Sequence, residues 1–192
     1  MYTPSRTRMA NSFRVSRGES FPYFITCTIV DWLPIFASDG YCRIVSESLA
    51  FLRQSKFTQI NAFVLMPTHL HAVLWPREGV SLSDVMRDFK RFTSRQISDL
   101  AEKLGDQNFL DVFRRARKRE NQTSASRYRV WQAGFHPEAI YSEDFARQKI
   151  DYIHNNPVRA GLAKTLLDWP YSSSHAYYSK SDGFPPIDVI EF

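Results

Sequence analysis

The chain has 192 residues, enough for one domain with its own core and too few for two full domains. Hydrophobic residues (43%) and aromatic residues (15%) exclude a disordered chain, and a net charge of +5 favours an anionic partner without requiring one. Two cysteines exclude a disulfide framework or zinc cluster, and no apolar run reaches the roughly 20 residues that span a bilayer. We therefore expect a cytoplasmic protein with no membrane contact.

The first elements follow an N-terminal stretch, residues 1–20, that carries four arginines and no apolar signal region, so we expect a mobile basic arm. Residues 23–30 are rich in β-branched and aromatic side chains, which predicts a strand. Apolar residues at helical spacing predict a helix over 40–55. Two short apolar runs, 60–66 and 69–75, lie on either side of Pro67 and Thr68 and predict an antiparallel hairpin.

A helix is predicted from a cap at Ser81 or Ser83 to Leu104, ended by Gly105. Residues 105–130 form a basic insertion, a short strand is predicted within 131–140, and Ser142 caps a last helix that runs into Asn156. The order predicts an α+β fold with a ferredoxin-like or RRM-like antiparallel sheet, β-α-β-β-α-β, helices on one face and an extra C-terminal helix carrying a tyrosine. One domain over 21–178 and a tail over 179–192 complete this organisation.

The pattern His69-Leu70-His71 is a candidate metal site. Residues i and i+2 of a strand point to the same face, so the two imidazoles project together and make half of a divalent-metal site. The alternative is a pair of exposed or internally bonded histidines. A nucleotide hydrolase of the HxHxH type is excluded because Val73 occupies the next alternating position.

The last helix carries a second candidate pair. Tyr152 and Asn156 lie at i and i+4 and share a helix face, so the Asn156 amide oxygen is a possible third ligand beside the Tyr152 hydroxyl. Pro157 disfavours helical geometry at the residue before it, which predicts that Asn156 sits at a helix end or kink. The alternative is an ordinary aromatic followed by a helix stop.

Together these segments resemble a known family. His69-Leu70-His71, preceded by Val64-Leu65-Met66-Pro67-Thr68, resembles the HUH motif of the Y1 (single-tyrosine) transposases. The segment 151–162, DYIHNNPVRAGL, is most similar to the tyrosine segment of the REP-associated tyrosine transposases. The similarity extends from about Phe21 to Ser174.

The resemblance implies an activity, a metal and a partner. Tyr152 would attack a phosphodiester of single-stranded or hairpin (palindromic) DNA and form a 5′-phosphotyrosine, so that strands are nicked and rejoined. His69, His71 and Asn156 would hold Mg²⁺ or Mn²⁺. Both monomers and homodimers occur in the wider group, and a monomer is the expectation here. The alternative function is a catalytically silent, RRM-like nucleic-acid-binding protein.

Basic residues are the candidates for contact with the DNA backbone. Aromatic residues near them, Phe113, Tyr128 and Trp131, are candidates for stacking on unpaired bases. The remaining histidines, His136, His154 and His175, receive no role in catalysis. The candidate DNA-binding residues are Arg87, Lys90, Arg91, Arg95, Arg114, Arg115, Arg117, Lys118 and Arg119.

Overall fold

A four-stranded antiparallel sheet forms the centre of the computed structural model, which describes residues 21–55, 58–119, 126–179 and 185–192. The strands are β1 (Tyr23–Thr28), β2 (Thr58–Met66), β3 (His69–Pro76) and β4 (Glu138–Ala139), in the spatial order β2-β3-β1-β4. This order and the mixed helices confirm the predicted α+β, ferredoxin-like class. The predicted N-terminal arm lies outside the described residues.

One strand is shorter than predicted. Only Glu138 and Ala139 form β4, whereas the preceding residues follow the edge of β1 through separate hydrogen bonds. The Gln132 amide donates to the Thr28 carbonyl at 2.8 Å, and the Thr26 amide donates to the Phe135 carbonyl at 3.0 Å. Positive φ angles at Gly134 (70°) and His136 (44°) bend this segment, so regular pairing cannot begin earlier.

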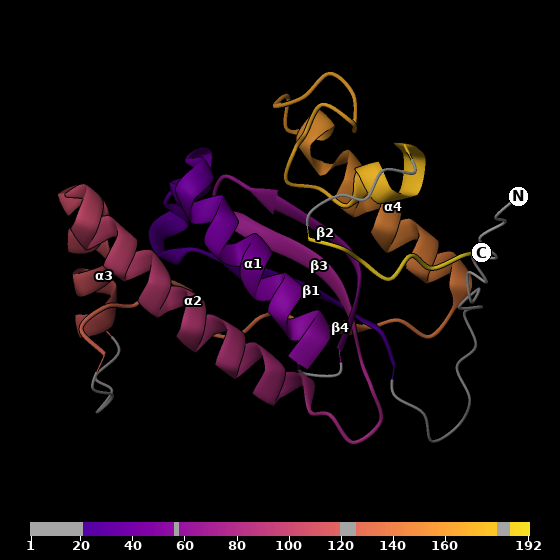
Figure 1. Cartoon of the computed structure of the whole chain (residues 1–192), viewed down its shortest axis with the longest axis horizontal. Coiled ribbons are helices and arrows are strands. Elements are labelled where there is room, and N and C mark those ends of the chain that lie inside the picture. The colour runs from indigo at the N-terminus through magenta and orange to yellow at the C-terminus, as the bar shows by residue number, and fades with distance from the viewer. Residues whose placement is uncertain (1–20, 56–57, 120–125, 180–184) are drawn as a thin grey trace, which may run out of the picture.

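Helices cover both faces of the sheet (Figure 1). α1 (Asp39–Ser55) and α2 (Leu82–Leu104) pack on one face, and α4 (Glu143–Arg159) packs on the other. Period-2 alternation of the strands supplies both cores, since Ile25, Leu70 and Leu74 face α1 and α2 while Phe24 and Val73 face α4. Shorter turns occur at Val30–Trp32, Ile35–Ala37 and His175–Ser179.

The helix boundaries follow from their caps. The Ser81 hydroxyl accepts from the Asp84 amide, Gly105 adopts a left-handed conformation (φ 74°) after α2, and the Ser142 hydroxyl accepts from the Phe145 amide. These are the predicted caps. The expected helix end at Asn156 is wrong, because α4 continues through the buried Pro157 to Arg159 and therefore holds Asn156 within the helix.

The basic insertion contains a helix that was not predicted, α3 (Gln107–Lys118). Leu110, Phe113 and Ala116 recur every third residue and are buried against the core beside α2, whereas the basic residues occupy the outer side. The insertion is thus part of the domain. Among the ranges that the structure describes, no helix is both long and apolar enough to cross a membrane.

The C-terminal segment packs on β2. Asp188 accepts two hydrogen bonds from Arg53 of α1, at 2.8 and 3.0 Å, and its backbone amide donates to the Ile60 carbonyl. Ile190 is buried in the α4 core. These contacts tie α1 and α4 to β2, the strand that pairs with the His69 and His71 strand in the hairpin.

Candidate active site

His69 and His71 lie side by side on the α4 face of the sheet. Both belong to β3, and their ring centroids are 4.6 Å apart. The intervening Leu70 is fully buried in the opposite core, as the strand periodicity predicts. The pair therefore projects from a central strand that is hydrogen-bonded on both sides, which gives both rings a rigid base.

Each imidazole is hydrogen-bonded by a threonine. The Thr26 hydroxyl lies 2.8 Å from His71 Nδ1, and the Thr68 hydroxyl lies 2.9 Å from His69 Nδ1. Thr26 is the direct cross-strand partner of His71 on β1. Sequence reasoning missed both threonines. Both contacts use Nδ1, so in each ring these hydrogen bonds leave Nε2 for another ligand.

The electrostatics keep both rings neutral. Burial lowers the pKa of His71 to about 3, with further lowering by His69 and the charge of Lys149, while a backbone hydrogen bond with Ile25 raises it. Burial also lowers the pKa of His69. A metal ligand must be the unprotonated imidazole, so this environment favours ligation at neutral pH.

Tyr152 of α4 meets the histidines across the sheet surface. Its ring centroid lies 5.3 Å from that of His71, in an edge-to-face arrangement. Phe24 supports both, stacked on His71 at 5.4 Å and edge-on to Tyr152 at 5.9 Å. Tyr152 keeps 36% of its surface exposed. The helix and the hairpin, 81 residues apart between Tyr152 and His71 (152 − 71), thus bring a phenol and an imidazole pair together at an accessible position.

Asn156 lies one helical turn beyond Tyr152 on the same face of α4, and it is half-buried. Within the described ranges, no group of three or more His, Cys, Asp and Glu side chains can hold a metal. A site here would therefore use the two imidazoles and an amide oxygen. Imidazole nitrogen with carbonyl oxygen is a donor set that accepts Mn²⁺ and leaves positions open for substrate.

Lys149 adds a positive charge beside this cluster. Its ammonium lies over the Phe24 ring at 4.4 Å and donates to Glu138 Oε2 at 2.8 Å, with 17% of its side chain exposed. A pocket of about 500 Å³ opens between Lys149 and Tyr152 along the outer side of α4. Its lining consists of Asp144, Arg147, Gln148, Lys149, Asp151, Tyr152, Asn155 and Arg159.

The remaining histidines lie away from this cluster. His154 is fully buried on the other side of α4, with Nε2 2.8 Å from the Ser173 hydroxyl. It packs against Tyr177 and Tyr178. His136 is exposed in the bend before β4, and His175 begins the turn His175–Ser179.

Known proteins share this architecture. The chain is 25% identical over 146 residues to the REP-associated tyrosine transposase of Escherichia coli (strain K12), covering 76% of this chain and 71% of that protein. It is 23% identical over 154 residues to a Haemophilus influenzae protein that carries the same name provisionally, covering 80% of this chain and 79% of that protein. A solved structure, of a REP-associated tyrosine transposase bound to a REP hairpin, superposes with a TM-score of 0.61 at 21% identity over 94% of each chain. No model of a known protein family matches the chain.

In this chain a tyrosine-bearing helix lies against a strand with the HxH pattern. The chain is therefore similar in sequence and in fold to the REP-associated tyrosine transposases.

A second candidate surface lies on the face of the sheet opposite Tyr152. A groove of about 880 Å³ runs between α2 and residues 126–135. Five of the nine predicted DNA-binding residues line it, together with two arginines that were not among the nine, Arg127 and Arg129. The five are Arg87, Lys90, Arg91, Arg95 and Arg117.

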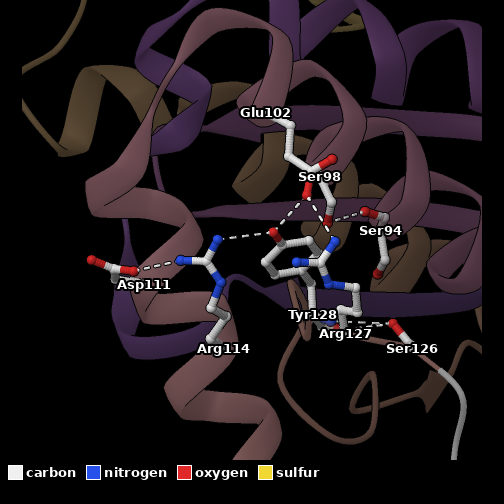
Figure 2. Close-up of polar contacts among 8 residues, drawn as sticks. All are labelled: Ser94, Ser98, Glu102, Asp111, Arg114, Ser126, Arg127 and Tyr128. Atoms are coloured by element: carbon white, nitrogen blue, oxygen red, sulfur yellow. Dashed lines mark hydrogen bonds and ion pairs between the residues drawn. The ribbon is translucent and has the colours of Figure 1, made fainter.

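Polar contacts hold the two walls of the groove together (Figure 2). The Tyr128 hydroxyl donates to Glu102 of α2 at 2.6 Å and accepts from Arg114 of α3 at 3.2 Å. Arg114 and Arg127 lie over the Tyr128 ring, at 5.4 and 5.6 Å from its centroid. Tyr128 thereby joins α2, α3 and the 126–135 segment. The contacts of Arg114 are structural ones within the protein.

The predicted cations differ in their surroundings. Lys90 donates to the Gln132 carbonyl at 2.9 Å and to that of Gly134, and burial lowers the pKa of its ammonium, so it fastens the segment to α2. The side chains of Arg91 and Arg95 are 77% and 82% exposed and pair with carboxylates of their own helix. Arg119 reaches Asp31 at 2.9 Å, whereas Arg115 and Lys118 are exposed on α3 outside the groove.

The predicted base-stacking aromatics are largely wrong. Phe113 and Trp131 are 0% and 3% exposed and belong to the core, and the Trp131 indole donates to Thr93 at 2.9 Å. Tyr128 already packs against two arginines, and the groove lining combines several cations and hydroxyls with the aromatic residues Trp131 and Phe135. Its chemistry suits a phosphate backbone more than unpaired bases.

Proposed function

We propose that this transposase cleaves and rejoins single-stranded DNA beside a hairpin, with Tyr152 as the nucleophile and with His69, His71 and Asn156 as ligands of Mg²⁺ or Mn²⁺. The observation that carries the proposal is the 5.3 Å approach of the Tyr152 and His71 rings. A noncatalytic nucleic-acid-binding protein gains nothing from an exposed phenol placed against the buried imidazole of His71 and the half-buried imidazole of His69.

Helix α4 supplies the nucleophile and strand β3 supplies the imidazoles. Tyr152 Oη attacks the scissile phosphorus, the bond from phosphorus to the 3′ oxygen breaks, the phenol proton passes to solvent and the 3′ oxygen takes up a proton. The products are a 5′-phosphotyrosine and a free 3′-hydroxyl, and reversal of the step on a second end rejoins DNA without a nucleotide cofactor. A divalent ion at the imidazoles would polarise the phosphate and stabilise the negative charge that develops on it.

The chain's own residues orient the strand. A phenol is a weak nucleophile while protonated, so the scissile phosphate must be held against Tyr152. The Lys149 side chain lies within one turn of Tyr152 on the same helix, so its positive charge can attract the phosphate to the phenol. Phe24 keeps Tyr152 and His71 in contact with the same apolar surface.

The hairpin partner is inferred from the relative solved with a REP hairpin and from the groove along α2. Arg87, Arg91 and Arg95 recur every fourth residue on α2, a row that can follow a phosphate backbone. We expect them to exchange their weak helical ion pairs for phosphates, since exposed pairs contribute little to stability. A monomer contains all of the proposed residues, so we expect a monomer to be active.

A covalent-adduct assay tests this function. The protein and Tyr152→Phe are incubated with a panel of labelled hairpins that carry single-stranded flanks, with Mn²⁺, Mg²⁺ or a chelator, and are resolved on a denaturing gel. We expect a metal-dependent covalent adduct with the wild type and none with Tyr152→Phe. Tyr178→Phe, which removes a half-exposed phenol outside the site, is the matched control and should form the adduct. Absence of an adduct on every hairpin would leave the noncatalytic alternative.

A further inference from the structure

The hydroxyls of Thr26 and Thr68 occupy equivalent positions on the two imidazoles. Each lies within hydrogen-bonding distance of an Nδ1 atom, at 2.8 Å for Thr26 with His71 and 2.9 Å for Thr68 with His69. The two threonines come from different elements, β1 and the turn between β2 and β3. The same contact made twice, from separate segments, indicates a requirement of the histidine pair rather than an accident of one strand.

The backbone holds both threonines firmly. The Thr26 amide donates to the Phe135 carbonyl at 3.0 Å, and the Thr68 carbonyl accepts from the Ile29 amide at 2.9 Å. Thr26 also faces His71 directly in the β1–β3 register. Side chains on such fixed backbone can set the direction of a ring, which a residue on a loose loop cannot do.

A neutral imidazole has one N–H and one lone pair, and a neighbour decides which nitrogen carries which. If Nδ1–H donates to the threonine oxygen, Nε2 presents its lone pair to a metal. If Nε2 carries the proton, the same ring cannot ligate through that atom. The threonine hydroxyl can accept from Nδ1–H or donate to an unprotonated Nδ1, and only the first arrangement leaves Nε2 able to bind a metal.

We propose that Thr26 and Thr68 are positioning residues that hold His71 and His69 in the Nδ1–H tautomer and leave both Nε2 lone pairs for the metal. The inference rests on the proposed metal site. It goes beyond that site by assigning the orientation of each ligand to a hydroxyl of another segment. Loss of such a supporting hydrogen bond weakens metal binding by roughly tenfold to a hundredfold.

Three variants of β1 separate the hydrogen bond from the shape of the side chain. Thr26→Val keeps the branched shape and loses the hydroxyl, while Thr26→Ser keeps the hydroxyl. Thr28→Val is the matched control, because Thr28 lies on the same strand and face opposite His69. Thr68→Val repeats the test for His69 from a different segment, so misfolding of the β1 variant would not remove the test.

Two measurements are made on each protein. The ¹⁵N NMR shifts of His71 without metal report which nitrogen is protonated, and Mn²⁺ titration followed by electron paramagnetic resonance reports affinity. We expect the Nδ1–H tautomer in the wild type, Thr26→Ser and Thr28→Val. Thr26→Val should lose this tautomer and bind Mn²⁺ about tenfold to a hundredfold more weakly.

Two outcomes would overturn the inference: wild-type His71 protonated on Nε2, or Thr26→Val with wild-type Mn²⁺ affinity. A failure of the proposed function is distinguishable from both. Suppose that the wild type binds no Mn²⁺, but that His71 is in the Nδ1–H tautomer in the wild type and not in Thr26→Val. The positioning role of Thr26 would then stand and the metal site would be refuted.

Discussion

The two faces of the sheet carry two different kinds of polar surface. On the α4 face, a few polar side chains lie in apolar surroundings and are placed by strands and a helix, with His71 6% exposed and stacked on Phe24. On the α2 face, the polar residues stand outside a closed core, on long side chains that pair with nearby carboxylates. The first surface has fixed geometry and the second has adaptable charge.

This difference indicates how the two surfaces contribute to function. Bond cleavage requires reacting groups held in place to a fraction of an ångström, which rigid elements supply. Backbone recognition requires many cations that can adjust and that respond to salt, which exposed arginines supply. A substitution on the α4 face should therefore alter rate, and one on the α2 face should alter affinity.

The largest effect is expected at His71. Replacing it by alanine removes one of the two imidazole ligands. Because this removes several kcal/mol of stabilisation of the transition-state charge, the cleavage rate should fall by roughly a thousandfold or more. Hairpin affinity should stay within about threefold of the wild type, because the groove is on the other face of the sheet. Single-turnover cleavage and fluorescence anisotropy measure the two quantities.

His136→Ala is the control for this experiment, since His136 is exposed in the bend before β4. Equal losses of binding and cleavage in His71→Ala would mean that the histidines maintain the fold, and the contrast between the two faces would then disappear.

A smaller effect concerns the acid stability of the α4 face. Burial lowers the pKa of His154 to about 4 in the folded protein, from an ordinary value near 6.5. Between these two pH values the unfolded chain therefore binds more protons than the folded protein. The contribution of His154 to the free energy of unfolding is complete above pH 6.5 and is lost as the pH falls towards 4. Lowering the pH from 7.5 to 5 should therefore reduce the free energy of unfolding by about 2 kcal/mol through this residue.

Urea unfolding at several pH values measures this contribution. His154→Gln, compared with its own stability at pH 7.5, should lose about 2 kcal/mol less than the wild type on acidification to pH 5. An unchanged slope in His154→Gln would show that the buried imidazole is not what makes this face sensitive to acid.

The sequence was most informative where local periodicity decides the structure. Alternation along β3 was enough to place His69 and His71 on one face, and the Ser81, Gly105 and Ser142 signals were enough to bound two helices. The same local reasoning missed α3. Its run of arginines drew attention to charge, whereas the buried spacing of Leu110, Phe113 and Ala116 was the signal of a helix.

The supporting contacts of the site depend on the pairing of distant segments. Thr26 and His71 are 45 residues apart, and only the β1–β3 register brings them together. Lys90 was indistinguishable from its arginine neighbours in the sequence, yet the fold turns its ammonium towards the carbonyls of Gln132 and Gly134. Residue type therefore suggested a function, but tertiary pairing decided which residue is free to perform it.

The smallest effect is expected in the groove, where each cation acts singly. Arg91→Ala combined with Arg95→Ala removes two exposed charges of the α2 row, and hairpin affinity should fall by about tenfold at moderate salt. The slope of log affinity against log salt should become shallower by about 2, because each arginine would neutralise one phosphate. Anisotropy titrations at several salt concentrations measure both values, and Lys103→Ala on the same helix, outside the groove lining, is the control. Cleavage at saturating DNA should be unchanged, because neither arginine lies on the α4 face. An unchanged salt slope would place the DNA elsewhere, and a large fall in the cleavage rate would mean that the two faces of the sheet do not divide binding from chemistry.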